Sequence, residues 1–265
     1  MNATVGAAID RAKSQGRAAL IGYLPVGFPT VAASVEAAAA LIEGGCDIVE
    51  LGLPYSDPVM DGPVIAQAVT AALAGGVRVD DTFRAVRELS PLGAPLLVMT
   101  YYNPVLRRGV ERFAGQLAEA GGAGLITPDL IPDEADEWLA ASDQHGLDRV
   151  FLVAPSSSDE RLALTAKACR GFTYATSTMG VTGVRSQLAD SARVLVERTR
   201  AAGAQRVCVG VGVSNPQQAA TVAGFADGVI VGSAFVKLLV AAPNAAAARR
   251  DLSGLAGELA AATRG

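Results

Sequence analysis

One acidic residue lies inside an apolar segment that has the composition of a buried strand. Glu50 interrupts the segment Ile48–Leu53, and the period-two alternation of a strand places it on the opposite face from Val49 and Leu51. If those two residues face covering helices, the Glu50 carboxyl points into the protein interior. Burial raises the pKa of a carboxyl toward the range useful for general acid–base catalysis. The alternative is a carboxyl at a frayed strand end in contact with water.

Two more carboxylates follow Glu50 in a loop that is rich in proline. Asp57 and Asp61 lie among three prolines, and a loop stiffened in this way can close over a site as a unit. A helix is expected to start near Gly62, so the Asp61 side chain is equally suited to capping that helix. The residues alone leave both capping and catalysis open for Asp61.

Glycine-rich turns follow the last three predicted strands, at Met179–Gly183, Gly210–Ser214 and Val231–Ala234. In parallel β/α barrels, the loops after strands seven and eight often hold a phosphate with backbone N–H groups at a helix N-terminus. Ser233 adds a hydroxyl at such a helix start. The turns therefore indicate a phosphorylated substrate. No glycine pattern typical of nucleotide binding is present, so we expect no nucleotide cofactor.

The residue counts exclude several chemistries. The chain has one histidine and three widely separated cysteines, which argues against a zinc site and against a redox pair. That histidine, His145, lies at the predicted C-terminal end of a helix, where a cation complements the helix dipole. None of the three lysines ends a predicted strand, which argues against Schiff-base chemistry. We expect no metal, and proton transfer carried by carboxylates.

The composition narrows the class of protein further. The formal net charge is -4 and 51% of the residues are hydrophobic, whereas 18% are charged. A strongly basic nucleic-acid binder is thereby excluded as the default. No uninterrupted apolar segment of about 18 residues is present, so no membrane span is expected. The first residues lack the apolar run of a signal peptide, and we expect a cytoplasmic protein with a large core.

Short β-rich segments alternate with helical ones along the whole chain. Eight such repeats without a linker favour a closed parallel barrel, which typically takes about 250 residues. We predict an α/β fold, a (β/α)8 TIM barrel forming a single domain over residues 1–265. One extra helix is predicted at Thr4–Ser14, and a second after strand two, because Gly62–Leu73 and Asp80–Leu89 both have helical spacing. The predicted strands are Ala18–Val26, Asp47–Leu53, Pro95–Thr100, Ala123–Thr127, Arg149–Ala154, Phe172–Thr176, Arg206–Gly210 and Gly228–Val231.

The segment around Glu50 resembles the signature of a known family. Val49–Pro58 followed by Asp61–Pro63 is similar to the alpha subunit of tryptophan synthase, and the resemblance extends over essentially the whole chain. The supporting segments, in the same order as in that family, are Gly22–Gly27, Tyr101–Pro104, Gly180–Gly183 and Gly232–Ala234.

The resemblance implies a carbon–carbon lyase. The reaction would be a retro-aldol cleavage of indole-3-glycerol phosphate to indole and D-glyceraldehyde 3-phosphate, in the pathway to L-tryptophan. The resemblance makes Glu50 the acid–base residue, which protonates indole C3 and removes the proton of the glycerol hydroxyl. It makes Asp61 the partner of the indole N–H, and so favours catalysis over capping.

The resemblance also implies the residues that contact the substrate. The phosphate would be held by Gly183, Gly212, Gly232 and Ser233. The indole side would be lined by Tyr23, Met99, Ile126 and Tyr174, for which membership of the barrel core is the alternative. Tyr101 would orient or contact the substrate, and Thr182 would help the loop after strand six to close against Asp61.

A partner chain is implied as well. The resemblance predicts an alpha2beta2 heterotetramer with the tryptophan synthase beta subunit, which receives the indole and holds the pyridoxal phosphate, so that no cofactor is expected in this chain. The residues expected near the interface are Tyr55, Asp57, Pro58, Asn103 and Asp129. Two rivals stand beside this interpretation: another phosphate-binding barrel enzyme, and a non-catalytic barrel that only binds and activates the beta subunit. The presence of both Glu50 and Asp61 favours catalysis.

Overall fold

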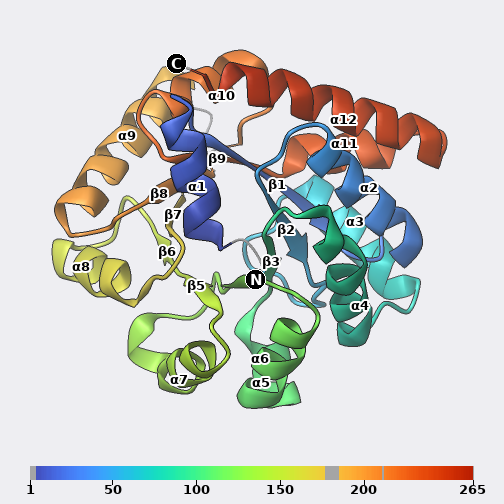
Figure 1. Cartoon of the computed structure of the whole chain (residues 1–265), viewed down its shortest axis with the longest axis horizontal. Helices are drawn as coiled ribbons and strands as arrows, with labels where there is room; N and C mark the ends of the chain where they lie inside the picture. The colour runs from blue at the N-terminus through green and yellow to red at the C-terminus, as the bar shows by residue number, and fades with distance from the viewer. Residues whose placement is uncertain (1–3, 177–184, 211, 265) are drawn as a thin grey trace.

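Parallel strands form one curved sheet at the centre of the molecule, with helices around its outside (Figure 1). The structure is a computed structural model, which describes residues 4–176, 185–210 and 212–264. Within these ranges the strands pair in the order β5-β4-β3-β2-β1-β9-β8-β7-β6. The strands are β1 (Ala19–Pro25), β2 (Ile48–Gly52), β3 (Leu96–Met99), β4 (Gly124–Ile126), β5 (Asp148–Val150), β6 (Leu152–Val153), β7 (Thr173–Thr176), β8 (Val207–Gly210) and β9 (Gly228–Val231).

The two outermost strands of this order are halves of one segment of the chain. Only Phe151 separates β5 from β6; β5 pairs with β4, and β6 pairs with β7. The backbone N–H of Tyr174 donates to the Phe151 carbonyl at 3.1 Å, which continues the ladder across the break. The sheet thus closes on itself at a segment that the sequence predicts as one strand, and the predicted (β/α)8 barrel is confirmed.

The helices lie where their hydrophobic spacing predicts them. The extra N-terminal helix is α1, and two helices, α3 and α4, stand between β2 and β3, as predicted. The helices are α1 (Val5–Ser14), α2 (Val31–Glu43), α3 (Pro63–Ala74), α4 (Val79–Leu89), α5 (Tyr102–Arg108), α6 (Val110–Glu119), α7 (Asp136–Gln144), α8 (Asp159–Ala168), α9 (Arg185–Ala201), α10 (Pro216–Ala223), α11 (Ser233–Ala241) and α12 (Ala245–Ala262). No helix among the described residues is long and apolar enough to cross a membrane.

Strand alternation divides the apolar side chains into two layers. On β2, Val49 and Leu51 belong to the cluster between the barrel and its helices, whereas Ile48 belongs to the cluster inside the barrel. Both faces of the strands are therefore buried, which explains the high apolar fraction of the sequence.

Helix α1 closes the end of the barrel at which the strands begin. It lies across the front of the barrel in Figure 1, and its residues Val5, Ala8, Ile9 and Ala12 belong to the interior cluster and have no exposed surface. Its first turn is capped by Thr4, whose hydroxyl accepts the Ala7 N–H at 3.2 Å, a contact that typically stabilises a helix by about 1 kcal/mol.

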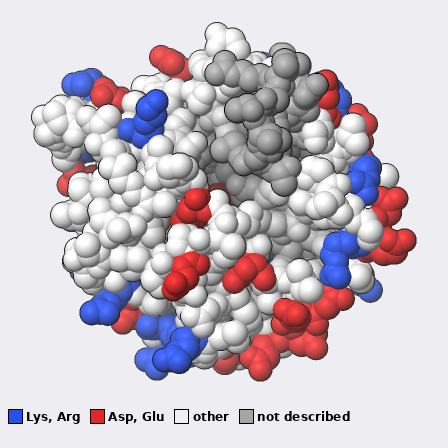
Figure 2. Space-filling view, turned by 180° about the vertical axis from the view of Figure 1, so that it is seen from behind, with Lys and Arg blue, Asp and Glu red and all other residues white. Residues whose placement is uncertain are grey.

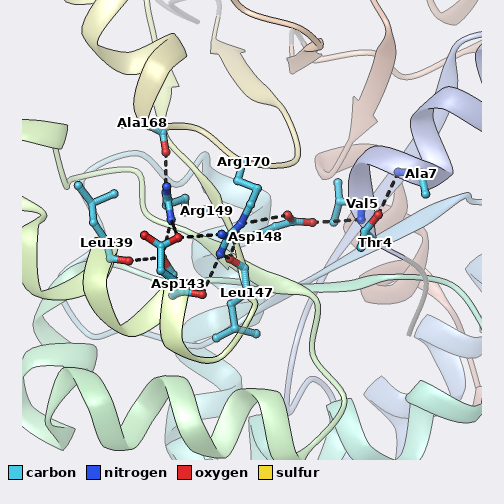
Figure 3. A network of polar contacts seen from close by, with 11 residues as sticks. Thr4, Val5, Ala7, Leu139, Asp143, Leu147, Asp148, Arg149, Ala168 and Arg170 are labelled. Carbon is cyan, nitrogen blue, oxygen red and sulfur yellow. Dashed lines mark hydrogen bonds and ion pairs between the residues drawn. The ribbon is translucent and has the colours of Figure 1, made fainter. Parts of the chain in front are cut away.

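A polar network fastens the start of α1 to the barrel (Figure 3). One carboxylate oxygen of Asp148, the first residue of β5, accepts the backbone N–H of Val5 at 3.1 Å. The other faces Arg170 at 3.7 Å, and Arg170 also pairs with Asp143 at 2.8 Å. Arg149 pairs with the same Asp143 at 2.5 Å. The network supplies partners for a carboxylate that would otherwise be buried alone.

Candidate active site

The Glu50 side chain points into the barrel, as the alternation of β2 predicts. The residue is 1% exposed and pairs in register with Tyr23 of β1, so it is not at a frayed strand end. Within the described part of the chain, its Oε1 atom has no hydrogen-bond partner. Burial raises the pKa of the Glu50 carboxyl to about 8, so the side chain carries a proton at neutral pH. A protonated carboxyl in a dry interior is suited to act as a general acid.

Two tyrosines enter the same space, Tyr23 from β1 and Tyr174 from β7. A Cβ atom added to Gly52 would lie 2.3 Å from the Tyr23 hydroxyl, and one added to Gly210 would lie 2.4 Å from the Tyr174 hydroxyl. Each hydroxyl thus lies over a position of the neighbouring strand that only glycine leaves open. Burial is the first cause of the raised pKa of both tyrosines, and the Glu50 charge adds to it. Both hydroxyls therefore keep their protons.

Asp61 lies beside Tyr101 rather than on a helix end. Helix α3 is capped by Gly62 without a side-chain hydrogen bond, so Asp61 does not have the capping role. The Tyr101 hydroxyl accepts the backbone N–H groups of Val59 and Met60 at 2.9 and 2.8 Å. It also hydrogen-bonds the Asp61 carboxylate, which partly offsets the rise in the pKa of Asp61 that burial causes. Tyr101 thereby ties the loop after β2 to the end of β3.

The glycine turns lie at the carboxyl ends of neighbouring strands. β8 and β9 pair in register, and Gly212 follows β8 with a φ of +67°, in the left-handed region that favours glycine. Gly232 caps α11, whose first residue is Ser233. Among the described residues, no side chain bonds the N–H groups at the start of this helix. Such N–H groups are free to bind an anion. Thr182 and Gly183 lie outside the described residues.

The other residues predicted to line the indole side differ in how deeply they are buried. Met99 is half-buried on β3, whereas Ile126 on β4 is fully buried in the interior cluster, below the exposed part of the site. Sequence reasoning missed Leu152, a half-buried residue that packs against that cluster. The strand predicted at Arg149–Ala154 carried the signal, because alternation puts Leu152 on one face with Val150. The substrate contacts of Met99 and Ile126 stay predictions.

The residues expected at a partner interface lie in the loops after β2 and β4 and, for Asn103, in the first turn of α5 after β3. The Asn103 amide donates to the Tyr55 hydroxyl at 3.3 Å, and the Tyr55 ring lies 5.2 Å from that of Tyr101. Asp129 accepts the backbone N–H of Tyr102 at 2.9 Å, which holds the start of α5.

The other two members of this set are Asp57 and Pro58. Asp57 is exposed and accepts the neighbouring Ser56 hydroxyl at 2.6 Å, whereas Pro58 is half-buried. Sequence reasoning did not assign to this interface Val59, Met60 and Ile131, exposed apolar side chains on the same loops (82%, 51% and 41%). The signal in the sequence that could have found them is the presence of apolar residues inside polar, proline-rich loops.

The histidine and the lysines that the residue counts exclude from catalysis lie away from the barrel interior. His145 caps the C-terminal end of α7, as predicted, and its Nε2 atom lies 2.6 Å from Glu111. Lys13 and Lys167 lie exposed on helices α1 and α8, as predicted. Across the described ranges no group of three or more His, Cys, Asp or Glu residues could hold a metal ion.

Charge is unevenly distributed over the face opposite α1 (Figure 2). Lys and Arg side chains lie toward the rim, whereas several Asp and Glu side chains lie nearer the middle. Binding of a phosphate by backbone N–H groups, rather than by basic side chains, stays a prediction.

These features define a class of protein. A (β/α)8 barrel with a buried, protonated carboxyl on β2, a second carboxylate in the loop after that strand and N–H groups at the start of α11 is suited to move protons on an anionic substrate. Active sites of this fold lie at the carboxyl ends of the strands, where these groups are found.

Comparison with known proteins gives the family. A sequence model of the tryptophan synthase alpha chain matches residues 9–264. The chain is 57% identical over 260 residues to the tryptophan synthase alpha chain of Salinispora arenicola, covering 98% of this chain and 97% of that one. A structure of Mycobacterium tuberculosis tryptophan synthase has 58% identity and a TM-score of 0.90, covering 100% and 99% of the two chains. A structure of the Pyrococcus furiosus tryptophan synthase complex has 31% identity and a TM-score of 0.82, covering 92% and 98%.

The chain therefore belongs to the tryptophan synthase alpha chain family. It is a lyase that catalyses the alpha reaction, the cleavage of indole-3-glycerol phosphate to indole and D-glyceraldehyde 3-phosphate.

Proposed function

We propose that Glu50 carries the proton transfers of this cleavage and that Asp61 stabilises the charge that develops on the indole ring. The observation that supports the proposal best is the buried Glu50 carboxyl, whose raised pKa of about 8 leaves it protonated at neutral pH. It transfers its proton to indole C3, while Asp61 accepts a hydrogen bond from the indole N–H and stabilises the positive charge on the ring. The Glu50 carboxylate then takes the proton of the glycerol hydroxyl next to the breaking bond. The carbon–carbon bond breaks, indole and the aldehyde form, and Glu50 is protonated again.

The phosphate is proposed to lie at the turns after β8 and β9. Gly212, Gly232 and Ser233 would hold it through backbone N–H groups at the start of α11, together with Gly183. Tyr23, Met99, Ile126 and Tyr174 would line the indole side, and Tyr101 would fix Asp61. Thr182 would contact Asp61 when the loop after β7 closes. Closure would exclude water from the carboxylates.

A direct test replaces the Glu50 carboxyl by an amide. We expect Glu50→Gln to lower the rate of indole release from indole-3-glycerol phosphate by at least about 100-fold, because the amide cannot donate and retake a proton. The matched control is Glu88→Gln on α4, which changes an exposed carboxyl outside the barrel and should keep full activity. Normal turnover in Glu50→Gln would contradict the assignment. No release by the unaltered chain, with beta activity still stimulated, would favour the non-catalytic rival.

We also propose an alpha2beta2 assembly in which the beta chain holds the pyridoxal phosphate. The support is family membership together with the apolar side chains exposed beside the site. Ile131→Asp should weaken association with a beta chain by about tenfold or more, because it buries a charge in the contact. Leu164→Asp is the control, since Leu164 is 48% exposed on the separate helix α8. Equal affinities in sedimentation analysis would argue against this contact surface.

The cytoplasm is the proposed location, on the basis of family membership. Fractionation of cells that produce the protein, followed by the indole-release assay on each fraction, tests it; activity confined to the periplasmic fraction would contradict it.

A further inference from the structure

The Tyr23 side chain lies between the phosphate turn and the catalytic strand. In the sheet, β1 stands between β9 and β2. A Cβ atom at Gly232 of the phosphate turn would lie 3.4 Å from the Tyr23 ring, and the Tyr23 hydroxyl lies over Gly52. The residue is 8% exposed. The ring is therefore held from both sides, and its hydroxyl has a fixed direction.

The Tyr23 hydroxyl is an unused donor. It makes no hydrogen bond with the described residues, although the ring that carries it is buried. Besides burial, the charges of Asp61 and Glu50 raise the pKa of Tyr23, because the hydroxyl lies close to both carboxylates. The hydroxyl thus keeps its proton throughout the pH range in which the chain works, and it can donate to a carboxylate.

Glu50 needs a donor during part of the reaction. While it is protonated, its unpaired Oε1 atom is tolerated inside the barrel. After it has given its proton to indole C3, the same buried group is an anion, and a buried anion without a hydrogen bond is costly. Asp61 already receives such a bond from the Tyr101 hydroxyl. No equivalent partner is bonded to Glu50 within the described residues.

The Glu50 charge raises the pKa of three donors inside the barrel, Tyr23, Tyr174 and Cys208, and Tyr23 is the best placed of them to bond Glu50. Tyr23 pairs with Glu50 directly in the β1–β2 register. Tyr174 stands on β7, which is not adjacent to β2, and its hydroxyl lies over Gly210. Cys208 on β8 offers only a weak S–H donor.

We propose that the Tyr23 hydroxyl is a positioning hydrogen-bond donor for the Glu50 carboxylate during the part of the cycle in which that carboxylate is ionised. The inference rests on the proposed acid–base role of Glu50. Tyr23 acts through Glu50 and not on the reacting atoms, so its removal changes the ionisation of Glu50 and the rate of proton transfer more than the binding of substrate.

The test is the pH dependence of kcat in Tyr23→Phe. Without the donor the ionised form of Glu50 loses stabilisation, so the pKa of Glu50 rises further above 8. The decline of kcat on the alkaline side should therefore move up by about one pH unit, and kcat at pH 7 should fall about tenfold, as expected for loss of a hydrogen bond to a charged group. KM should change by less than about twofold.

Tyr102→Phe is the matched control. It removes a hydroxyl from the layer outside the barrel, near Glu137, and should leave the pH profile of kcat unchanged. Gly52→Ala is the second variant, because its added Cβ displaces the Tyr23 hydroxyl without deleting it, and it should move the alkaline limb in the same direction.

An alkaline limb that stays in place in Tyr23→Phe, with only KM raised, would overturn the inference and leave Tyr23 with no role beyond lining the indole side. Failure of the proposed function gives a different result from failure of this inference, namely full indole release by Glu50→Gln. If Tyr23→Phe does not fold, as judged by circular dichroism, the profile of Gly52→Ala decides.

Discussion

At the scale of single residues, burial of the Glu50 carboxyl lowers the free energy of unfolding at neutral pH, and it also raises the pKa that suits this group to acid catalysis. Its pKa is about 8 in the folded chain, against an ordinary value of 4.5. Between these two values the unfolded chain has released the proton whereas the folded chain retains it. Each pH unit in this window therefore favours unfolding by about 1.4 kcal/mol. The penalty is absent below about pH 4.5 and complete above about pH 8.

Glu50→Gln should remove this dependence on pH. We expect the free energy of unfolding of the variant, relative to the unaltered chain, to increase by a few kcal/mol between pH 5 and pH 8, in the direction of a more stable variant. Urea unfolding at several pH values measures the difference. A difference that stays constant with pH would mean that Glu50 titrates at its ordinary pKa in the folded chain.

At the same scale, the inward direction of Glu50 could be predicted, but the partner of Asp61 could not. Alternation along one strand is a local property, so it fixes the side of Glu50. The contact of Asp61 with Tyr101 joins residues 40 positions apart in the loops after two neighbouring strands. Such a contact depends on how the loops pack, and no spacing in the sequence records it.

At the scale of elements, helix α1 owes its place to apolar burial more than to its surface charges. Ile9 has no exposed surface, whereas the Lys13 side chain is 71% exposed and pairs with Asp227 at 3.4 Å. Ile9→Ala should lower the free energy of unfolding by about 2–5 kcal/mol, and Lys13→Ala by less than about 1 kcal/mol. Chemical denaturation of both variants tests the contrast. Equal losses would mean that the ion pair, and not the interior cluster, holds the helix.

The elements themselves were the most predictable part of the fold. Helical spacing located α1 and α4 to within one residue at each end, because each buries one continuous apolar face. The break at Phe151 was not predicted. The two halves of that segment bond different neighbours, β4 and β7, and this division appears only when the sheet closes.

At the scale of the whole molecule, the prediction of a single domain can be tested with the only tryptophan. Trp138 is fully buried in α7, whereas Leu252 is fully buried in α12, which packs along α2. Leu252→Ala should lower the unfolding midpoint measured by Trp138 fluorescence and by circular dichroism to the same extent, because one domain unfolds as a unit. A fluorescence midpoint that stays in place while the circular dichroism midpoint falls would show two separate domains.

Helix α1, which closes one end of the barrel, also determines by which end substrate and products can pass. Because Val5, Ala8, Ile9 and Ala12 fill one end, we expect substrate to enter and both products to leave by way of the other end. A chain that covers this open end would decide whether indole escapes to water or passes to a second active site. A receiving chain therefore needs to seat only on the loops around the mouth to capture the product, and no passage through this barrel is required.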